Sequence, residues 1–345
     1  MRELKRLEEN WDFPMERIQE SLEFRDFIRK TYKKCKDYYF YVVDGKIQAI
    51  FPFFLLRSDI FGDRFISLPY LDVGGFSGEF DYKDIKKIIE EIKKKEIKHI
   101  EVRLNKFLPN YEKTKVALVR AGFQQQKTKQ QFILKLTSEE DMWKRFHKHT
   151  RNDIRLAMKS DLDMKKIDNV KEMKSFFKLY VKEMRNFGTP QHSFKFFKNM
   201  FEIMKPLGLN CYKDGKIIGG LIMLKYKKEA YIMFNISKSK FRKYRPNDLL
   251  YWSAIRWAID HKLKIIDLGQ IDKEVEKGTH AHGLYKFKSK WLAELYDRVY
   301  FYYSKDQKTS GGNKEMYKGL RGLWRKIPLF GTKIIGPKIA AELGL

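Results

Sequence analysis

The chain has 345 residues, enough for about two domains with sizeable cores, which excludes a single small module. Hydrophobic residues make up 43% and aromatic residues 15%, which excludes a disordered chain although 34% of the residues are charged. The 72 Lys and Arg residues against 44 Asp and Glu residues give a net charge of +28, which favours a polyanionic partner such as nucleic acid, anionic lipid or a phosphorylated substrate. Adaptation to heat is an alternative source of a composition rich in lysine and glutamate.

Cysteine usage and hydropathy narrow the class further. Cys35 and Cys211 lie far apart without CxxC or Cys/His spacing, so we expect no disulfide framework, no zinc site and a reducing compartment. The N-terminus MRELKRLEENWDF lacks the apolar core of a signal peptide, and no stretch reaches the roughly 18 consecutive apolar residues of a membrane span. We therefore expect a cytoplasmic protein.

The first predicted elements are two apolar strands within 38–56, joined at Asp44-Gly45, a sequence typical of a type I′ hairpin. After this hairpin the pattern predicts a strand, a helix, a strand and a second helix, at 64–68, 82–95, 99–104 and 111–121.

A second series of the same kind starts at the hairpin 209–225, whose turn is Asp214-Gly215. It continues with a strand, a helix and a strand, at 229–235, 246–261 and 264–268. Both hairpins share the turn Asp-Gly-Lys-Ile. Two copies of one mixed α/β unit are the simplest account of this repeat.

Between the copies, overlapping capping-box patterns from Thr137 to Asp141 predict a helix that runs to about Lys159. Its predicted core face is Trp143, Phe146, Thr150, Ile154 and Ala157. Five cations recur on another face: Lys144, Lys148, Arg151, Arg155 and Lys159. Like charges at this spacing repel one another, so we interpret the row as a contact to phosphate or nucleic acid, with a merely solvated face as the alternative.

Two further helices are predicted at 170–185 and 194–204, separated by Gly188-Thr189-Pro190. The region is dense in phenylalanine, and aromatic residues at helical spacing favour a core over a ligand site. We expect His192, in the loop, to be an ordinary surface histidine.

The stretch 264–291 is the candidate site. Its apolar strand is expected to break at Gly269 into a polar loop that delivers Tyr285, Lys286 and Lys288 to the edge of the sheet. Asp267 and Gln270 lie at the polar end of the strand. An ordinary strand and loop with surface lysines is the alternative interpretation.

The C-terminal segment mixes Trp, Leu and Ile with Arg and Lys after a polar, linker-like stretch at 304–316. Such a segment can lie on an anionic membrane face or dock onto its own domain, and both interpretations stay open. No P-loop, GxSxG, HExxH or GxGxxG motif is present, so nucleotide hydrolysis, serine esterase, zinc protease and Rossmann redox chemistry have no motif support.

Several stretches together resemble the FemABX-type peptidyltransferases and their FemAB-like relatives. They are SLPYLDVGGF (67–76), TRNDIRLAMKS (150–160), MRNFGTP (184–190), FRKYRPNDLLYWSAIRWA (241–258), IIDLGQ (265–270), the pattern Gly-x-Tyr-x-Phe-Lys-x-x-Trp (283–291) and WRKIPLFGTKIIGPKIA (324–340). The resemblance implies an α/β fold with a mixed sheet and two tandem GNAT-type acyltransferase domains. We place the domains at 1–137 and 138–305, followed by a basic, apolar tail at 306–345.

The resemblance also implies a function: transfer of an aminoacyl group from aminoacyl-tRNA to an amine of a cell-envelope precursor peptide or glycan, of peptidoglycan, pseudomurein or another wall polymer, at the inner face of the membrane. No cofactor is implied beyond the donor. Lys288, preceded by Phe287, resembles the lysine that such relatives place near the transferring ester, where its ammonium would stabilise the developing oxyanion. The predicted catalytic residues are Lys288, Tyr285 and Asp267, and the predicted substrate-binding residues are Gln270, Phe287, Lys148, Arg151, Arg155, Lys159, Arg242, Tyr244 and Lys36.

Two departures from the family pattern concern the acceptor: Leu292 stands where many relatives have glycine, and Gln270-Ile271 where some carry Arg-Ser. An acyl-CoA-dependent N-acyltransferase is the alternative enzyme, although 241–248 lacks the glycines that usually hold a pyrophosphate. A non-catalytic basic protein that binds RNA or anionic lipid is the third possibility.

Overall fold

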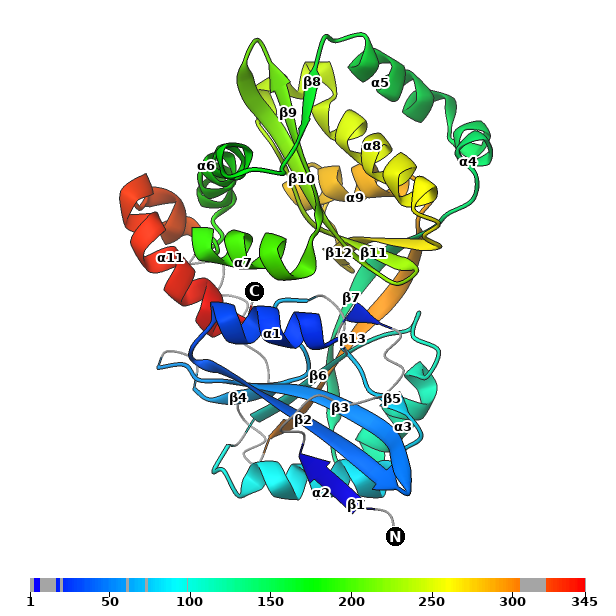
Figure 1. Cartoon of the computed structure of the whole chain (residues 1–345), viewed down its shortest axis with the longest axis vertical. Coiled ribbons are helices and arrows are strands. Elements are labelled where there is room, and N and C mark those ends of the chain that lie inside the picture. The colour runs from blue at the N-terminus through cyan, green and yellow to red at the C-terminus, as the bar shows by residue number, and fades with distance from the viewer. Residues whose placement is uncertain are drawn as a thin grey trace. The chain divides into compact units, whose positions relative to one another are not determined.

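The computed structural model describes residues 3–6, 17–18, 21–59, 62–71, 74–97, 99–304 and 321–344. Internal contacts divide the chain into two compact units, shown in Figure 1. Unit 1 holds the described residues up to 130, with 296–304 and 338–344, and unit 2 holds 131–295 with 321–337. The chain passes between units inside β7 (Gln124–Lys135) and β13 (Glu294–Ser304). The expected boundaries after 137 and 305 stay predictions.

Unit 1 is a sheet with helices on both faces. Its strands lie in the order β1 (Glu3–Arg6), β2 (Cys35–Asp44), β3 (Lys46–Leu56), β4 (Arg64–Ile66), β6 (His99–Asn105) and β13, with the short β5 (Ser77–Gly78) beside β3. The helices α2 (Tyr82–Lys93) and α3 (Tyr111–Arg120) cover the face that carries Phe53 and Phe65. The helix α1 (Leu22–Thr31) covers the opposite face, where Phe24 packs against Phe54.

Unit 2 repeats this plan. Its strands lie in the order β7, β12 (Ile265–Asp272), β11 (Glu229–Ser237), β10 (Lys216–Tyr226), β9 (Leu207–Lys213) and β8 (Asp163–Lys166). One face carries α5 (Lys148–Met158), α8 (Pro246–Asp260) and α9 (His280–Ser289), which share a core with the strands. The other face carries α6 (Val170–Phe187) and α7 (Phe194–Met204). Two neighbouring glycines of β10 show which helix covers each face. A Cβ atom added at Gly219 would meet Leu250 of α8, and one added at Gly220 would meet Phe176 of α6.

The predicted repeat is confirmed. In each copy an antiparallel hairpin leads to a third strand, a helix, and then a strand parallel to the third, which is β4 beside β6 in one copy and β11 beside β12 in the other. The last strands are exchanged between copies, since β13 pairs with β6 and β7 lies beside β12. No sequence pattern predicts this exchange.

The two hairpin turns differ, although their sequences match. Asp214 and Gly215 both adopt positive φ, at 50° and 68°, as a type I′ turn requires. In the first hairpin only Gly45 does so, Asp44 pairs with Lys46 across it, and the register shifts between Val42 and Val43. The type I′ prediction is therefore confirmed for the second hairpin and wrong for the first.

The helix predicted from 137 to about 159 is two helices. The first is α4 (Glu139–Arg145), which ends at Phe146, where ψ is 138°. The second, α5, starts after His147, whose ring nitrogen accepts a hydrogen bond from the His149 amide at 3.3 Å. The predicted core side chains of this region are buried nonetheless, including Phe146, Thr150, Ile154 and Ala157. The helical periodicity predicted the buried positions correctly. It did not predict the break at Phe146 and the cap at His147.

Two further predictions near the candidate site were wrong. The strand β12 does not end at Gly269 but continues to Asp272, because glycine accepts the φ of +85° found there. The expected loop that carries Tyr285 and Lys288 is the helix α9, whose first turn is capped by the Thr279 hydroxyl accepting from the His282 amide at 3.2 Å.

His192 is not a surface residue. Its ring is buried and stacks on Phe196 at a centroid distance of 3.9 Å, and its backbone amide donates to the Tyr180 hydroxyl at 3.0 Å. Burial lowers the pKa of His192 to about 3, so the ring is neutral at neutral pH.

Among the residues that the structure describes, no helix is both long enough and apolar enough to cross a bilayer. The polar stretch at 304–316 lies almost entirely outside the described residues. The rest of the tail is described from 321 and contains α11 (Leu329–Leu343).

Candidate active site

The predicted site residues of β12 and α9 lie together in unit 2. Lys288 is buried in the last turn of α9, and its Nζ donates to the backbone carbonyl of Gln270 at 3.2 Å. Asp267, three residues before Gln270 on β12, is also buried. Its carboxylate accepts hydrogen bonds from the Gly269 amide at 2.7 Å and from the side chain of Gln131. The site therefore holds a buried lysine amino group that donates to a backbone carbonyl of the neighbouring strand.

The aromatic residues of α9 pack into the core of unit 2. Tyr285 contacts Phe132 of β7 at a ring distance of 5.7 Å, and Phe287 meets Tyr251 of α8 edge to face at 4.8 Å. These contacts fasten α9 to β7 and to α8. Lys286, between the two aromatic residues in sequence, is exposed.

The cation row separates into members with different roles. Lys144 belongs to α4, whereas Lys148, Arg155 and Lys159 are exposed on α5 or at its C-cap. Arg155 lies over the Trp143 ring at 5.3 Å. Arg151 is half-buried and donates to the carbonyls of Trp143, Lys144 and Phe146, at 3.4, 2.9 and 2.8 Å, so it closes the C-terminus of α4.

Arg242 and Tyr244 lie in the 3₁₀ segment Ser239–Tyr244, just before α8. Arg242 is exposed, and the Tyr244 ring has the ammonium groups of Lys243 and Lys213 above it, at 5.0 and 5.7 Å. The amides of Asp248 and Leu249 both donate to the Arg245 carbonyl, at 3.0 and 3.3 Å, and Pro246 has no amide hydrogen. The start of α8 therefore offers few free backbone donors to a phosphate.

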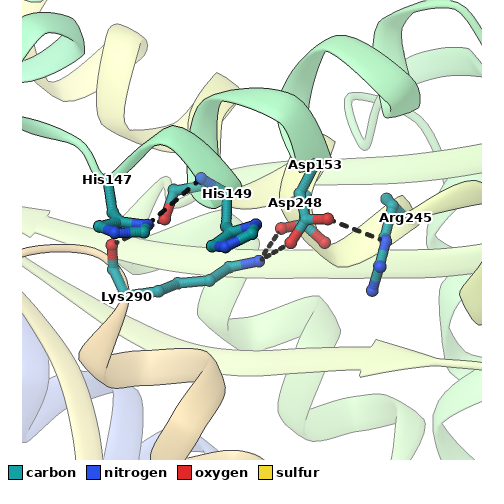
Figure 2. Close-up of polar contacts among 7 residues, drawn as sticks. His147, His149, Asp153, Arg245, Asp248 and Lys290 are labelled. Atoms are coloured by element: carbon teal, nitrogen blue, oxygen red, sulfur yellow. Dashed lines mark hydrogen bonds and ion pairs between the residues drawn. The ribbon is translucent and has the colours of Figure 1, made fainter.

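Sequence reasoning missed an ion-pair cluster beside the site, drawn in Figure 2. Lys290 Nζ contacts Asp153 Oδ2 of α5 at 2.9 Å and also the Asp248 carboxylate of α8, while Arg245 Nε lies 3.1 Å from Asp153 Oδ1. Burial raises the pKa of Asp248 although Lys290 opposes the shift. The cluster joins α5, α8 and the C-cap of α9, two residues after Lys288. No motif signals it, since its members come from three separate segments.

The ring of His149 stacks on that of His147 at 5.1 Å next to this cluster. Thr150 Oγ1 donates to the Lys290 carbonyl at 3.3 Å, which adds a second connection between α5 and the end of α9.

Lys36, the last of the predicted residues, belongs to unit 1, where it is exposed on β2. A hollow of about 580 Å³ in the same unit has both signs of charge in its lining, with Arg57, Lys94 and Lys95 against Asp63 and Glu96. It contains none of the predicted site residues.

Lys288 can supply charge stabilisation in unit 2. Burial raises the pKa of the Cys211 thiol to about 12, so this side chain is not a thiolate nucleophile at neutral pH. Among the described residues, no group of three or more His, Cys, Asp and Glu side chains is arranged to hold a metal. A buried lysine beside a backbone carbonyl can stabilise an oxyanion for a reaction in which the substrates bring their own nucleophile and leaving group.

Comparison with known proteins agrees with the fold. The sequence model of the family described as an acetyltransferase (GNAT) domain matches residues 144–288, which lie in unit 2 and end at Lys288. The Lipid II:glycine glycyltransferase of Staphylococcus aureus is 23% identical over 88 residues, which make up 26% of this chain. The match spans 21% of the length of that relative.

Solved structures share the arrangement over most of both chains. FemX superposes with a TM-score of 0.67 at 12% identity, over 87% of this chain and 93% of that one. L-PGS from Bacillus licheniformis gives 0.55 at 12% identity, over 85% and 90%. A tandem GNAT protein from the clavulanic acid biosynthesis pathway gives 0.57 at 10% identity, over 91% and 100%. These findings confirm the mixed α/β fold with tandem GNAT-type domains and the resemblance to FemABX-type GNAT proteins.

Proposed function

We propose that the protein is an aminoacyltransferase that moves an aminoacyl group from aminoacyl-tRNA to an amine of a lipid-linked cell-envelope precursor. The buried Lys288 of α9, held at the Gln270 carbonyl inside the stretch that matches the GNAT family, is the observation that carries the proposal. The Staphylococcus aureus relative that matches part of this chain is named a Lipid II:glycine glycyltransferase. This name supports an aminoacyl group as the transferred group and a lipid-linked molecule as the acceptor.

The proposed step needs no cofactor. The acceptor amine attacks the ester carbonyl carbon, a C–N bond forms, the ester C–O bond breaks, and the amine proton ends on the departing ribose oxygen. The Lys288 ammonium stabilises the negative charge that develops on the carbonyl oxygen. Binding the two substrates next to each other supplies the remaining rate enhancement.

The other predicted residues take supporting roles in this proposal. Asp267 accepts hydrogen bonds from Gln131 and Gly269, so it shapes β12 beside Gln270 and is a positioning residue. Tyr285 and Phe287 fix α9 on the core.

Exposed cations supply the phosphate contacts. Lys148, Arg155 and Lys159 bind the tRNA backbone or an acceptor pyrophosphate, Arg242 and Tyr244 contact the substrate before α8, and Lys36 of unit 1 binds an acceptor phosphate. Arg151 acts through the position of α4 rather than by contact.

An acyl-CoA-dependent N-acyltransferase is the second candidate, and the GNAT family match is the observation that favours it. It ranks second because CoA-binding helices usually offer free backbone amides to the pyrophosphate. Here the Asp248 and Leu249 amides already donate to Arg245, and the nearby Arg242 and Lys243 offer side-chain charges instead.

The donor experiment separates these candidates. Bulk tRNA charged with labelled amino acids and labelled acetyl-CoA are offered in parallel, with lipid II as the acceptor probe and uncharged tRNA as a binding control. Label that reaches lipid II from tRNA supports the proposal, and label that reaches it only from acetyl-CoA favours the second candidate. Equal binding of charged and uncharged tRNA with no transfer would leave a basic RNA-binding protein.

A further inference from the structure

The described part of the tail in unit 2, residues 321–337, has one face docked and one face free. Trp324 and Thr332 are buried, Arg185 Nε donates to the Ile327 carbonyl at 2.6 Å, and Gln191 Nε2 donates to the Thr332 carbonyl at 2.6 Å. These hydrogen bonds attach the segment to the end of α6 and to the α6–α7 loop. Within residues 321–337, the interpretation that the tail docks onto its own domain therefore holds for the face that carries these contacts.

The free face carries large apolar side chains. Phe330 is 70% exposed and Ile334 is 72% exposed, one helical turn apart on α11. The other apolar members are Leu323, Leu329 and Ile335. An exposed apolar group of this kind, concentrated in one short segment, indicates a contact surface rather than ordinary scatter.

The exposed charges of the segment 321–337 itself have one sign. The exposed charged residues of 321–337 are Arg321, Arg325, Lys326 and Lys333. The single acidic residue of the described tail is Glu342, which is buried and accepts from Ser58. An occupant of the face must therefore be apolar inside and anionic at its border.

We propose that this face, defined by Leu323, Leu329, Phe330, Ile334 and Ile335 with Arg321, Arg325, Lys326 and Lys333, docks the protein peripherally on an anionic lipid bilayer. Helical segments with aromatic and aliphatic residues between lysines and arginines lie at the boundary of headgroups and acyl chains, where the apolar side chains insert and the cations meet lipid phosphates. The proposal does not depend on the transfer reaction.

Other occupants fit less well. A second copy of the chain would bring the same four cations against this set, which like-charge repulsion opposes. A nucleic acid would pair with the cations but would leave Phe330 and Ile334 without an apolar environment, since recognition of a phosphate backbone rests on charge.

Vesicle flotation with the full-length protein tests the proposal. Phosphatidylcholine vesicles with and without phosphatidylglycerol are compared at near-physiological salt, and binding is expected only with the anionic lipid. Phe330→Ser with Ile334→Ser should weaken partitioning by about tenfold or more, because two apolar side chains no longer insert. Arg325→Gln with Lys326→Gln and Lys333→Gln should weaken it to a similar degree.

Matched controls separate this face from general effects. Val116→Ser with Val119→Ser removes two apolar side chains that are 51% and 53% exposed on α3. Lys83→Gln with Lys86→Gln and Lys87→Gln removes three exposed lysines of α2. Both control variants should float like the wild type, and all variants should keep its thermal unfolding curve because every changed side chain is exposed.

Three results would overturn the proposal. They are absence of wild-type binding to anionic vesicles, equal losses in the test and control variants, or a dimer in sedimentation velocity that Phe330→Ser with Ile334→Ser dissociates while vesicle binding is unchanged. The last result would assign the face to self-association.

Discussion

The Nζ of Lys288 donates to the carbonyl oxygen of Gln270 at 3.2 Å, so the last turn of α9 is joined to β12 by a buried ammonium. Lys286, two residues earlier on the same helix, is exposed. A helix turns about 200° over two residues, which explains why only one of these lysines enters the site. The pair therefore provides a natural comparison between a site lysine and a surface lysine.

Lys290 is expected to stabilise unit 2 by its contacts with Asp153 and Asp248. Lys290→Met removes the cation and leaves the buried Asp248 carboxylate without its partner, which should cost about 2–3 kcal/mol in the free energy of unfolding. Urea unfolding at neutral pH measures this, with the exposed Lys87→Met as the matched control. A cost equal to that of the control would show that the ion pairs contribute nothing.

The same variant should have a characteristic pH dependence. Burial already raises the pKa of Asp248, and loss of Lys290 removes the main interaction that lowers it. A folded-state pKa above the unfolded one means that stability from this group increases as the pH falls through that value. The deficit of Lys290→Met should therefore shrink on acidification, and a deficit that grows would contradict the assignment.

His192 should make the wild-type protein sensitive to mild acid. Its pKa is lowered to about 3 by burial from an ordinary value of 6.5, so the unfolded chain binds the proton first. Stability from this group is complete above pH 6.5 and is lost as the pH falls below it, by roughly 2 kcal/mol at pH 5. His192→Phe keeps a ring beside Phe196. In this variant the free energy of unfolding should change less between pH 7 and pH 5 than it does in the wild type. An equal change in both proteins would mean that other groups control this pH dependence.

Leu292 occupies a backbone conformation that suits glycine. Its φ is 63°, in the left-handed region that glycine adopts without a steric penalty. Comparing Leu292→Gly with Leu292→Ala isolates the backbone, because both variants lack the leucine side chain. The glycine variant should be more stable by about 1 kcal/mol, whereas glycine is the less stable of the two at ordinary positions. The opposite order in thermal unfolding would contradict the left-handed conformation.

The exposed cations of α5 should control the salt dependence of tRNA binding. Lys148→Gln with Arg155→Gln and Lys159→Gln should reduce the slope of log affinity against log salt by about 0.7–0.9 per lost phosphate contact. Arg151 is left intact in this variant because it closes α4. The control variant, which loses the same number of charges, is Lys83→Gln with Lys86→Gln and Lys87→Gln. If both variants change the slope equally, the α5 cations form a merely solvated face.

Much of the fold could be predicted because it depends on local patterns. The Asp-Gly turns between apolar strands predicted the positions of both hairpins. The apolar periodicity of 246–261 predicted the position of α8. The errors came from features that compete locally with those patterns. A cap at His147 divides one predicted helix, and Gly269 continues a strand where its sequence suggested a break.

Parts of the site were beyond sequence reasoning because they depend on long-range contacts. Lys290 meets Asp153 and Asp248 from distant segments, and nothing in the local sequence selects these partners among many carboxylates. The position of His192 in the loop beside Gly188-Thr189-Pro190 favours an ordinary surface histidine. Its burial comes from the ring of Phe196 and from Phe234 of β11.

Aminoacyl transfer by Lys288→Met beside Lys286→Met, measured with charged tRNA and lipid II at saturating concentrations of both, tests the role of Lys288 directly. Both variants remove one lysine charge from α9, so general electrostatic effects are matched. If Lys288 stabilises the oxyanion, Lys288→Met should lower the transfer rate by about a hundredfold or more with tRNA affinity unchanged, while Lys286→Met retains the wild-type rate. A Lys288→Met enzyme with the wild-type rate would contradict the assignment of this lysine to the oxyanion.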